Sequence, residues 1–284
     1  MPELPEVETV RRGLAERVLG RRIEHVEVGR WRAVRRTGPE RVISGLTGRS
    51  IVAAERRGKY IVCPLDSGES LMVHLRMSGQ LLVDPIDTPR PLHSHVNLRL
   101  ASVGERRPVE ELRFVDPRTF GEVVVFAPHE AEVLVPELGR LGPDPLVDSV
   151  TLADLRRRLA ATRRGAKAVL LDQAVIAGIG NIYSDEILHR AGIHPLRPAN
   201  RIGRAPAERL LRAVDEVLRA AVAAGGSTLR DAQYVDLEGR TGTFQASHRV
   251  YGRAGEVCLT CGRGRIKTAT VAGRTGHWCA VCQR

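Results

Sequence analysis

The N-terminal residues of this chain could supply a nucleophile. Residues 2–8 read Pro-Glu-Leu-Pro-Glu-Val-Glu, so removal of Met1 would leave Pro2 with a free secondary amine and carboxylates beside it. A secondary amine can attack an electrophilic carbon and form an iminium, which is an electron sink of the kind used in covalent catalysis. Taken alone, these residues favour an exposed, disordered N-terminus; the rest of the chain changes that interpretation.

Four cysteines near the C-terminus have the spacing of a zinc ribbon. Cys258 and Cys261 form one C-x2-C pair, Cys279 and Cys282 form another, and seventeen residues separate the pairs. Four thiolates at this spacing are typical of a closed, tetrahedral structural site. Two disulfides are the alternative, which a chain without a secretion signal does not favour. We therefore expect one structural zinc ion per chain.

Basic residues occupy the segment between the cysteine pairs, at Arg263, Arg265, Lys267 and Arg274. A zinc ion would fix this segment as a basic β-hairpin that contacts a nucleic-acid backbone or enters a groove. Zinc ribbons also bind proteins, and basicity is the feature that favours nucleic acid. The whole chain carries 44 Lys and Arg against 33 Asp and Glu, a net charge of +11, which favours an anionic partner without excluding a merely basic soluble protein.

Three further residues lie in turns after β-rich runs. Exposed apolar side chains at loop tips beside an arginine would suit a wedge that unstacks bases, and Met77, Arg118 and Phe120 fit this description. Ordinary core packing is the commoner role of a lone Met or Phe. Lys59, at the start of a strand, would bind phosphate or transfer a proton, or else is solvated in a basic turn.

Residues 178–183, Gly-Ile-Gly-Asn-Ile-Tyr, resemble a dinucleotide-binding loop only superficially. Tyr183 occupies the third glycine position, and a helix rather than a strand precedes the segment. We interpret it as a tight turn between helices, with Asn181 as the cap of the second helix and free backbone N–H groups that can receive a phosphate. A plain helical hairpin turn explains the segment equally well.

The elements that hold these residues indicate an α+β fold. Apolar residues three and four apart predict a helix over 6–19. An antiparallel β-sandwich or flattened barrel follows, with strands expected at 23–28, 50–52, 60–65, 96–100 and 122–126. Beyond a linker, helical spacing recurs, and a long polar stretch over 226–244 is typical of a functional loop. The later helices are expected at 152–161, 166–176, 182–191 and 206–224.

This pattern divides the chain into four segments. They are an N-terminal β-sandwich domain with a flanking helix at 1–132, a linker at 133–150, a helical domain at 151–248 and a C-terminal zinc-ribbon hairpin at 249–284. No apolar run has the length of a membrane span, and no signal peptide is recognised. We therefore expect a cytoplasmic protein with reduced thiols, in which Cys63 is a buried core residue.

Together these segments resemble the formamidopyrimidine-DNA glycosylase family, whose sister branch is endonuclease VIII. The matching motifs follow the family's order and cover almost the whole chain. Leu4 in place of glycine, together with Met77, Arg118 and Phe120, favours the oxidised-purine branch. The motifs are residues 2–8, 57–60, 74–79, 116–121, 178–183 and 250–253 and the four cysteines; residues 178–183 would belong to the family's helix–two-turn–helix.

The resemblance implies five catalytic residues. Pro2 would be the nucleophile at C1′ of the damaged nucleoside, and Glu3 the acid that protonates the sugar side of the bond. Glu6 would help to position the active site. Lys59 would assist elimination and contact phosphate, and Arg274 would hold a phosphate near the lesion and assist the second elimination.

The resemblance also implies DNA contacts. Met77 would fill the space left by the extruded base, while Arg118 and Phe120 would engage the orphan base and its neighbour. The loop over 227–243 would cover the flipped base. The resemblance places Arg76 where glycine is common in the family, and the arginine would add a phosphate contact. It places Thr243, which precedes Phe244, where an aromatic residue is frequent. The residues expected to bind DNA are Met77, His93, Arg118, Phe120, Arg164, Lys167, Asn181 and Tyr183.

The expected function is therefore that of a bifunctional repair enzyme. It would act as a monomer on double-stranded DNA that contains oxidised bases or abasic sites, excising 8-oxoguanine and formamidopyrimidines and then cutting the strand by β,δ-elimination. It would be cytoplasmic and associated with the nucleoid through DNA. Two alternatives stay open: excision of oxidised pyrimidines, as in endonuclease VIII, and a non-catalytic binder of damaged DNA, which would apply if Met1 were retained.

Overall fold

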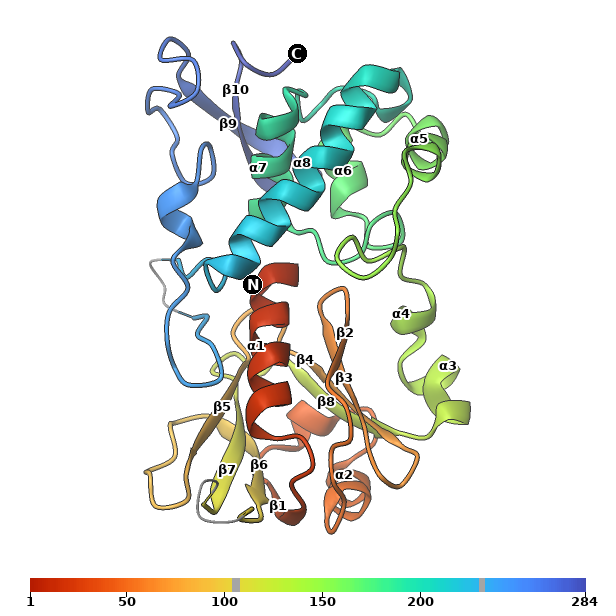
Figure 1. The fold of residues 1–284 in the computed structure, drawn as a ribbon, viewed down its shortest axis with the longest axis vertical. Helices are drawn as coiled ribbons and strands as arrows, with labels where there is room; N and C mark the ends of the chain where they lie inside the picture. Colours follow the sequence, from red (N-terminus) through yellow and green to blue (C-terminus); the bar gives the residue numbers. More distant parts are fainter. Residues whose placement is uncertain (104–107, 230–232) are drawn as a thin grey trace. The chain divides into compact units, whose positions relative to one another are not determined.

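The structure, a computed structural model, describes residues 1–103, 108–229 and 233–284. Contacts divide the chain into two compact units (Figure 1). The first comprises Met1–Gly139 and Ala224–Thr243, and the second comprises Arg140–Ala223 and Phe244–Arg284. The four-segment division expected from the sequence stays a prediction. None of the helices within the described ranges combines the length and the apolar character that crossing a bilayer requires.

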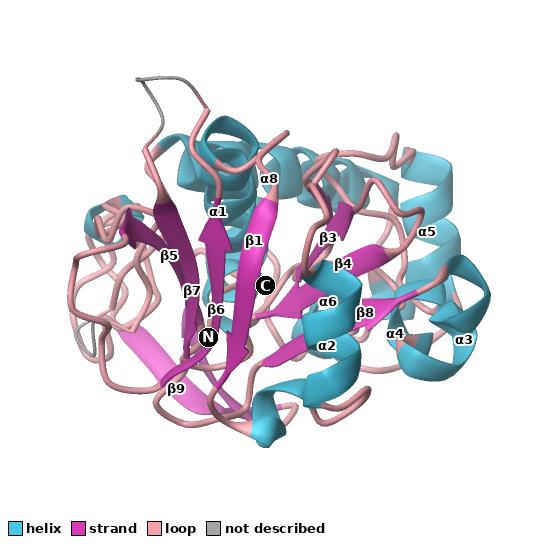
Figure 2. Cartoon of the chain, turned by 90° about the horizontal axis from the view of Figure 1, so that it is seen from below, coloured by secondary structure: helices cyan, strands magenta, loops and turns pink. Residues whose placement is uncertain are grey.

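The first unit is built on two four-stranded antiparallel sheets, whose strands appear in magenta in Figure 2. Alternate side chains of each sheet, such as Leu98 and Val73, are buried in one apolar cluster, so the predicted sandwich is confirmed. One sheet has the order β1 (Ile23–Val28), β6 (Ser94–Leu100), β7 (Glu110–Val115) and β5 (Gln80–Pro85), and the other has β2 (Glu55–Arg57), β3 (Tyr60–Pro64), β4 (Ser70–His74) and β8 (Glu122–Phe126).

Helix α1 (Leu4–Arg17) packs its apolar stripe of Val7, Val10 and Leu14 into this core. The expected strand at 50–52 is wrong, because these residues form only isolated bridges. Cys63 is buried as expected. Several short helices were not expected. They are η1 (Trp31–Val34), α2 (Pro39–Leu46), η2 (Pro128–Glu130), α3 (Ala131–Leu134) and α4 (Pro136–Gly139). One of them, α4, lies inside the predicted linker, and another, α3, overlaps its start.

The second unit contains the four expected helices. Helix α6 ends five residues early, because the Asp172 side chain accepts a hydrogen bond from the Ala174 N–H and closes a turn. The hairpin between the cysteine pairs is confirmed, and its turn residues Ala272 and Gly273 both have positive φ, as a type I′ turn requires. The elements are α5 (Leu152–Ala160), α6 (Ala166–Leu171), α7 (Asn181–Ala191), η3 (Ala199–Arg201), α8 (Arg204–Ala223), η4 (Phe244–Ser247), β9 (Ile266–Val271) and β10 (Arg274–Cys279).

The polar segment after α8 belongs to the first unit by its contacts. Tyr234 and Leu237 are buried in the core cluster of the sandwich. The Val83 N–H donates to the Leu237 carbonyl over 2.9 Å, and the Gln80 side-chain amide donates to the Gln233 carbonyl over 3.0 Å. Two apolar anchors therefore hold this polar segment against the sandwich. Residues 230–232 of the expected base-covering loop lie outside the described residues.

Candidate active site and DNA-contacting residues

The N-terminal segment is held in place rather than left exposed. Pro2, Glu3 and Glu6 are buried. The Glu3 N–H donates to Oε2 of Glu6 over 2.8 Å, and the Ser227 N–H donates to Oε1 of the same carboxylate over 2.7 Å. Glu6 thus joins the start of α1 to the segment after α8. The positioning role expected of Glu6 stays a prediction.

Gly226 makes that junction possible. Its φ is +82°, which favours glycine, and a Cβ there would lie 2.7 Å from Oε1 of Glu6. The hydroxyl of Tyr234 donates to the Gly225 carbonyl over 2.9 Å. The turn after α8 is therefore fitted around the Glu6 carboxylate.

Lys59 lies in the two-residue turn between β2 and β3. Gly58 has a φ of +59°, and Lys59 is 7% exposed, so it is not a solvated lysine. Arg56 donates to the Gly58 carbonyl over 3.1 Å and to Glu8 of α1 over 3.1 Å. The turn that carries Lys59 is thereby connected to α1.

Glu8 is the acidic partner in that connection. Burial tends to raise the pKa of Glu8, but hydrogen bonds from Arg11, Arg12 and Arg56 outweigh it and lower the pKa to about 2. The carboxylate is therefore ionised at neutral pH and holds three guanidinium groups near the start of the chain.

The candidate wedge residues lie on two loops of the sandwich. Met77 is half-buried between β4 and β5, whereas Arg118 and Phe120 are exposed between β7 and β8. The Arg118 guanidinium lies 4.9 Å from the centre of the Phe120 ring, a cation–π contact. His93 is exposed just before β6, with a φ of +69°. Core packing, the alternative for Phe120, is therefore excluded by its 42% exposure.

Two of the expected DNA-binding residues in the second unit are buried. Lys167 is fully buried, with Nζ 2.7 Å from Oδ1 of Asp185 and 3.1 Å from the Thr275 carbonyl. Tyr183 is also fully buried, and its ring lies 5.8 Å from that of Phe244. Their DNA contacts stay predictions, and a phosphate contact by Lys167 would require the ion pair to open.

The other expected residues of this unit are more accessible. Arg274 is exposed at the start of β10, and Arg164 is exposed and paired with Asp172 over 2.7 Å. Asn181 does not cap α7. Gly180 is the N-cap, with φ −127° and ψ −156°, and Asn181 is the first helical residue. The extended backbone of Gly180 displaces the cap by one position, and the Asn181 Oδ1 has no hydrogen-bond partner among the residues that the structure describes.

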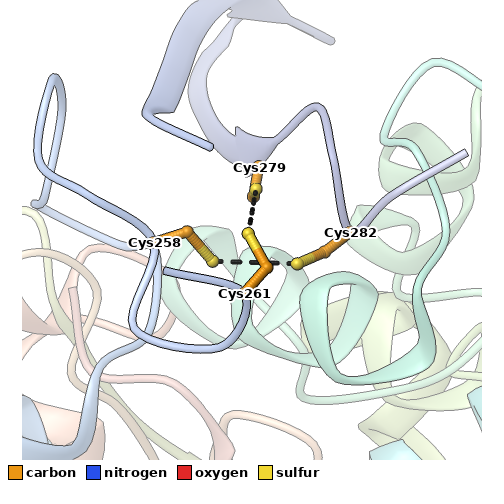
Figure 3. A group of neighbouring side chains, drawn as sticks. All are labelled: Cys258, Cys261, Cys279 and Cys282. Atoms are coloured by element: carbon orange, nitrogen blue, oxygen red, sulfur yellow. Dashed lines mark hydrogen bonds between the residues drawn. The ribbon is translucent and has the colours of Figure 1, made fainter. Parts of the chain in front are cut away.

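The four cysteines form one cluster (Figure 3). Sγ of Cys258 lies 3.7 Å from that of Cys282, and Sγ of Cys261 lies 3.8 Å from that of Cys279. Thiolates about 2.3 Å from a tetrahedral zinc ion stand about 3.8 Å apart, so the cluster fits such an ion. The close packing extends to Gly264, where a Cβ would lie 2.6 Å from the Cys279 sulfur.

The structure thus gathers the candidates into two groups. The first unit carries Pro2, Glu3, Glu6, Lys59, Met77, His93, Arg118 and Phe120, and the second carries Arg164, Lys167, Asn181, Tyr183, Arg274 and the four cysteines. Sequence reasoning missed several buried acids that hold these residues, notably Asp116, Glu122 and Asp185. Asp116 begins the motif at 116–121 and Asp185 is four residues after Asn181, so their positions beside motif residues were the available signal.

Comparisons with known proteins agree with this geometry. The formamidopyrimidine-DNA glycosylase N-terminal domain matches residues 1–123, and the H2TH domain of the same enzymes matches residues 141–233. The formamidopyrimidine-DNA glycosylase of a Nocardioides species is 46% identical and covers all of this chain and 94% of its own length. That of Parasynechococcus marenigrum is 44% identical, with complete coverage of both chains.

Solved structures of formamidopyrimidine-DNA glycosylases are also similar to this chain. The Lactococcus lactis Fpg in complex with DNA containing an abasic site has a TM-score of 0.88 at 36% identity and covers 99% of both chains. The same protein in complex with Fapy-dG containing DNA has a TM-score of 0.87. The two domain matches span most of the chain, and the relatives match it over its full length and share its fold. This chain therefore belongs to the formamidopyrimidine-DNA glycosylase family, whose members are repair enzymes with DNA glycosylase and abasic-site lyase activities.

Proposed function

We propose that this enzyme excises oxidised purines, 8-oxoguanine and formamidopyrimidines, from double-stranded DNA and then cuts the abasic strand by β,δ-elimination. The observation that carries the proposal is the N-terminal segment, in which Pro2 and Glu3 are buried and Glu6 accepts hydrogen bonds from two backbone N–H groups. The names of the full-length relatives and the Fapy-dG DNA in a similar structure support this substrate class.

Pro2 is the nucleophile in this proposal. Once Met1 is removed, the Pro2 amine bonds to C1′ while the glycosidic bond breaks. The electron pair of that bond and a proton go to the departing base. Glu3 supplies a proton on the sugar side, and opening of the ring gives an iminium. The iminium acidifies the C2′ proton, whose loss expels the 3′ phosphate; a second elimination, assisted by Lys59 and Arg274, expels the 5′ phosphate.

The base must leave the stack before this attack, at a cost of a few kcal/mol. Met77 would offset that cost by occupying the vacated space, and Arg118 and Phe120 would engage the orphan base. Phosphate contacts by Arg274 would add a salt-dependent contribution to binding. In this proposal the enzyme works as a monomer in the cytoplasm.

The bound metal in this proposal is one zinc ion held by Cys258, Cys261, Cys279 and Cys282. A closed site with four thiolates leaves no open position for substrate, so the metal supplies folding energy to the hairpin rather than chemistry. The hairpin in turn presents Arg274 at the first residue of β10.

Borohydride reduction tests the mechanism. A Met1-free preparation, verified by intact mass, should form a covalent adduct with duplex DNA that contains 8-oxoguanine, because borohydride reduces the iminium. The variant Pro2→Gly keeps an N-terminal amine and should trap more weakly, whereas Pro5→Ala, a matched proline replacement three residues on, should trap normally. Lack of an adduct with the parent enzyme would disprove the covalent mechanism, and preferential trapping on thymine glycol would assign the enzyme to oxidised pyrimidines.

A further inference from the structure

Two buried carboxylates flank the loop that carries Arg118 and Phe120. Asp116 precedes the loop and Glu122 follows it, and their exposures are 0% and 2%. Each also reaches the loop that carries Met77. The Ser78 hydroxyl donates to Oδ1 of Asp116 over 2.5 Å, and Arg76 donates to Oε1 of Glu122 over 2.9 Å. The two residues on either side of Met77 are therefore attached to the two ends of the other loop.

The same carboxylate of Asp116 also fixes its own loop. Its Oδ1 accepts the Arg118 N–H over 3.2 Å, and its Oδ2 accepts the Gly121 N–H over 2.6 Å. A Cβ on Gly121 would lie 2.5 Å from the Phe114 ring and 3.1 Å from Oδ2 of Asp116. Asp116 is thus an acceptor for donors from both loops at once, in a site with no spare space.

Arg76 has a backbone that a non-glycine residue rarely adopts. Its φ is +53°, a left-handed conformation that is unfavourable for an L-residue with a side chain. Its N–H donates to Nδ1 of His74 over 2.9 Å. Burial and the nearby positive charges of Arg76 and Lys59 lower the pKa of His74 to about 3, so the ring is neutral and Nδ1 accepts. Arg76 is thus a residue in a strained backbone conformation whose side chain is bound to Glu122.

We propose that the pairs Arg76–Glu122 and Ser78–Asp116 form a loop clamp that holds Met77 and the Arg118–Phe120 loop as one rigid wedge before DNA binds. Arg76 is then a positioning residue, not a phosphate ligand. The clamp rests on the proposed function, since a wedge is needed only where a base leaves a duplex. A preformed wedge avoids the entropy cost of ordering two loops at the moment of base extrusion.

The variants Arg76→Gly and Ser78→Ala test the clamp. Glycine accepts positive φ, so Arg76→Gly should fold normally, and its melting temperature checks this. On lesion-containing duplex DNA we expect kcat/KM to fall about 10- to 100-fold for the double variant, as misplacement of reacting groups does. Lyase activity on a single-stranded abasic oligonucleotide should stay within about twofold, because no base pair is opened there. Ser44→Ala, an exposed serine on α2, is the matched control.

A double-mutant cycle separates a clamp from a phosphate contact. If Arg76 acts through Glu122, adding Arg76→Gly to Glu122→Gln should cause little further loss on duplex DNA, and the salt dependence of binding should not change. If the losses of kcat/KM from the two substitutions instead multiply, and the slope of log affinity against log salt concentration falls by about one, Arg76 contacts a phosphate and the clamp is overturned. Equal losses on duplex and single-stranded DNA, or no loss, would overturn it too. If the proposed function itself fails, the parent enzyme forms no adduct on either substrate.

Discussion

Replacing Lys167 by methionine should strongly destabilise the second unit. Lys167 and Asp185 are both 0% exposed, and their charged atoms lie 2.7 Å apart. The other oxygen of Asp185 accepts the backbone N–H of His277 over 2.9 Å and contacts Nδ1 of its ring at 3.0 Å. Methionine fills similar space but leaves a buried carboxylate without its counter-charge. Removal of one partner from a buried ion pair costs about 3–5 kcal/mol.

Thermal unfolding followed by circular dichroism measures this loss. Since 1 kcal/mol shifts Tm by roughly 2–4 °C in chains of this size class, Lys167→Met should lower Tm by roughly 6–20 °C. Adding Asp185→Asn removes the uncompensated charge and should recover part of the loss. Arg157→Met breaks an exposed pair with Asp154, whose side chains are 73% and 38% exposed, and should cost at most about 1 kcal/mol. A Tm equal to that of Arg157→Met, with weakened duplex binding, would refute the structural role and identify Lys167 as a phosphate ligand.

Three more predictions follow from the site. Because the folded-state pKa of Glu8 is depressed to about 2, its ion pairs stabilise the fold above about pH 4.5 and lose that effect as the pH falls towards 2. The urea midpoints of unfolding of the parent enzyme and of Glu8→Gln should therefore differ at pH 6 and converge near pH 2. Gly226→Ala should lower duplex excision more than Gly239→Ala, since both sites have positive φ but only the first new Cβ meets Glu6; equal rates would contradict this. Cys261→Ser should reduce the amount of bound metal, measured by plasma emission spectrometry. It should also weaken the affinity for duplex DNA roughly tenfold or more, because the hairpin is lost. Full affinity for duplex DNA without bound metal would contradict this prediction.

Local patterns in the sequence were sufficient for much of the fold. Helix α1 follows from apolar spacing, the sandwich from alternating strands, and the cysteine cluster from two C-x2-C pairs, because each signal lies within a few residues. The short helices α3 and α4 were missed because tertiary contacts stabilise them. Arg36 donates to the Leu134 carbonyl over 2.7 Å and pairs with Glu137 over 2.8 Å, across about a hundred residues of sequence.

The candidate site was harder to predict for the same reason. The partners Ser78 and Asp116 are 38 residues apart, and Glu6 and Ser227 are 221 apart, so no local pattern links them. The cap assigned to Asn181 was wrong because the choice between adjacent cap positions depends on the backbone of Gly180, which composition does not report. Residues that could do chemistry are recognisable by type, whereas the partners that hold them in place are identified by contacts between segments far apart in the sequence.

Although the chain has a net charge of +11, buried acids hold the segments that carry the candidate residues. Glu6, Asp116 and Asp185 each accept backbone N–H groups from one or more segments next to a candidate residue, and Glu186 accepts three in a row, from residues 249–251, over 2.8–3.0 Å. An ionised carboxylate has about four acceptor sites, so one acid can fix a loop that several neutral side chains would otherwise have to hold. Neutralising one of these acids should therefore lower excision from lesion-containing duplex DNA more than removing an exposed arginine with no assigned role in DNA binding or catalysis, such as Arg157.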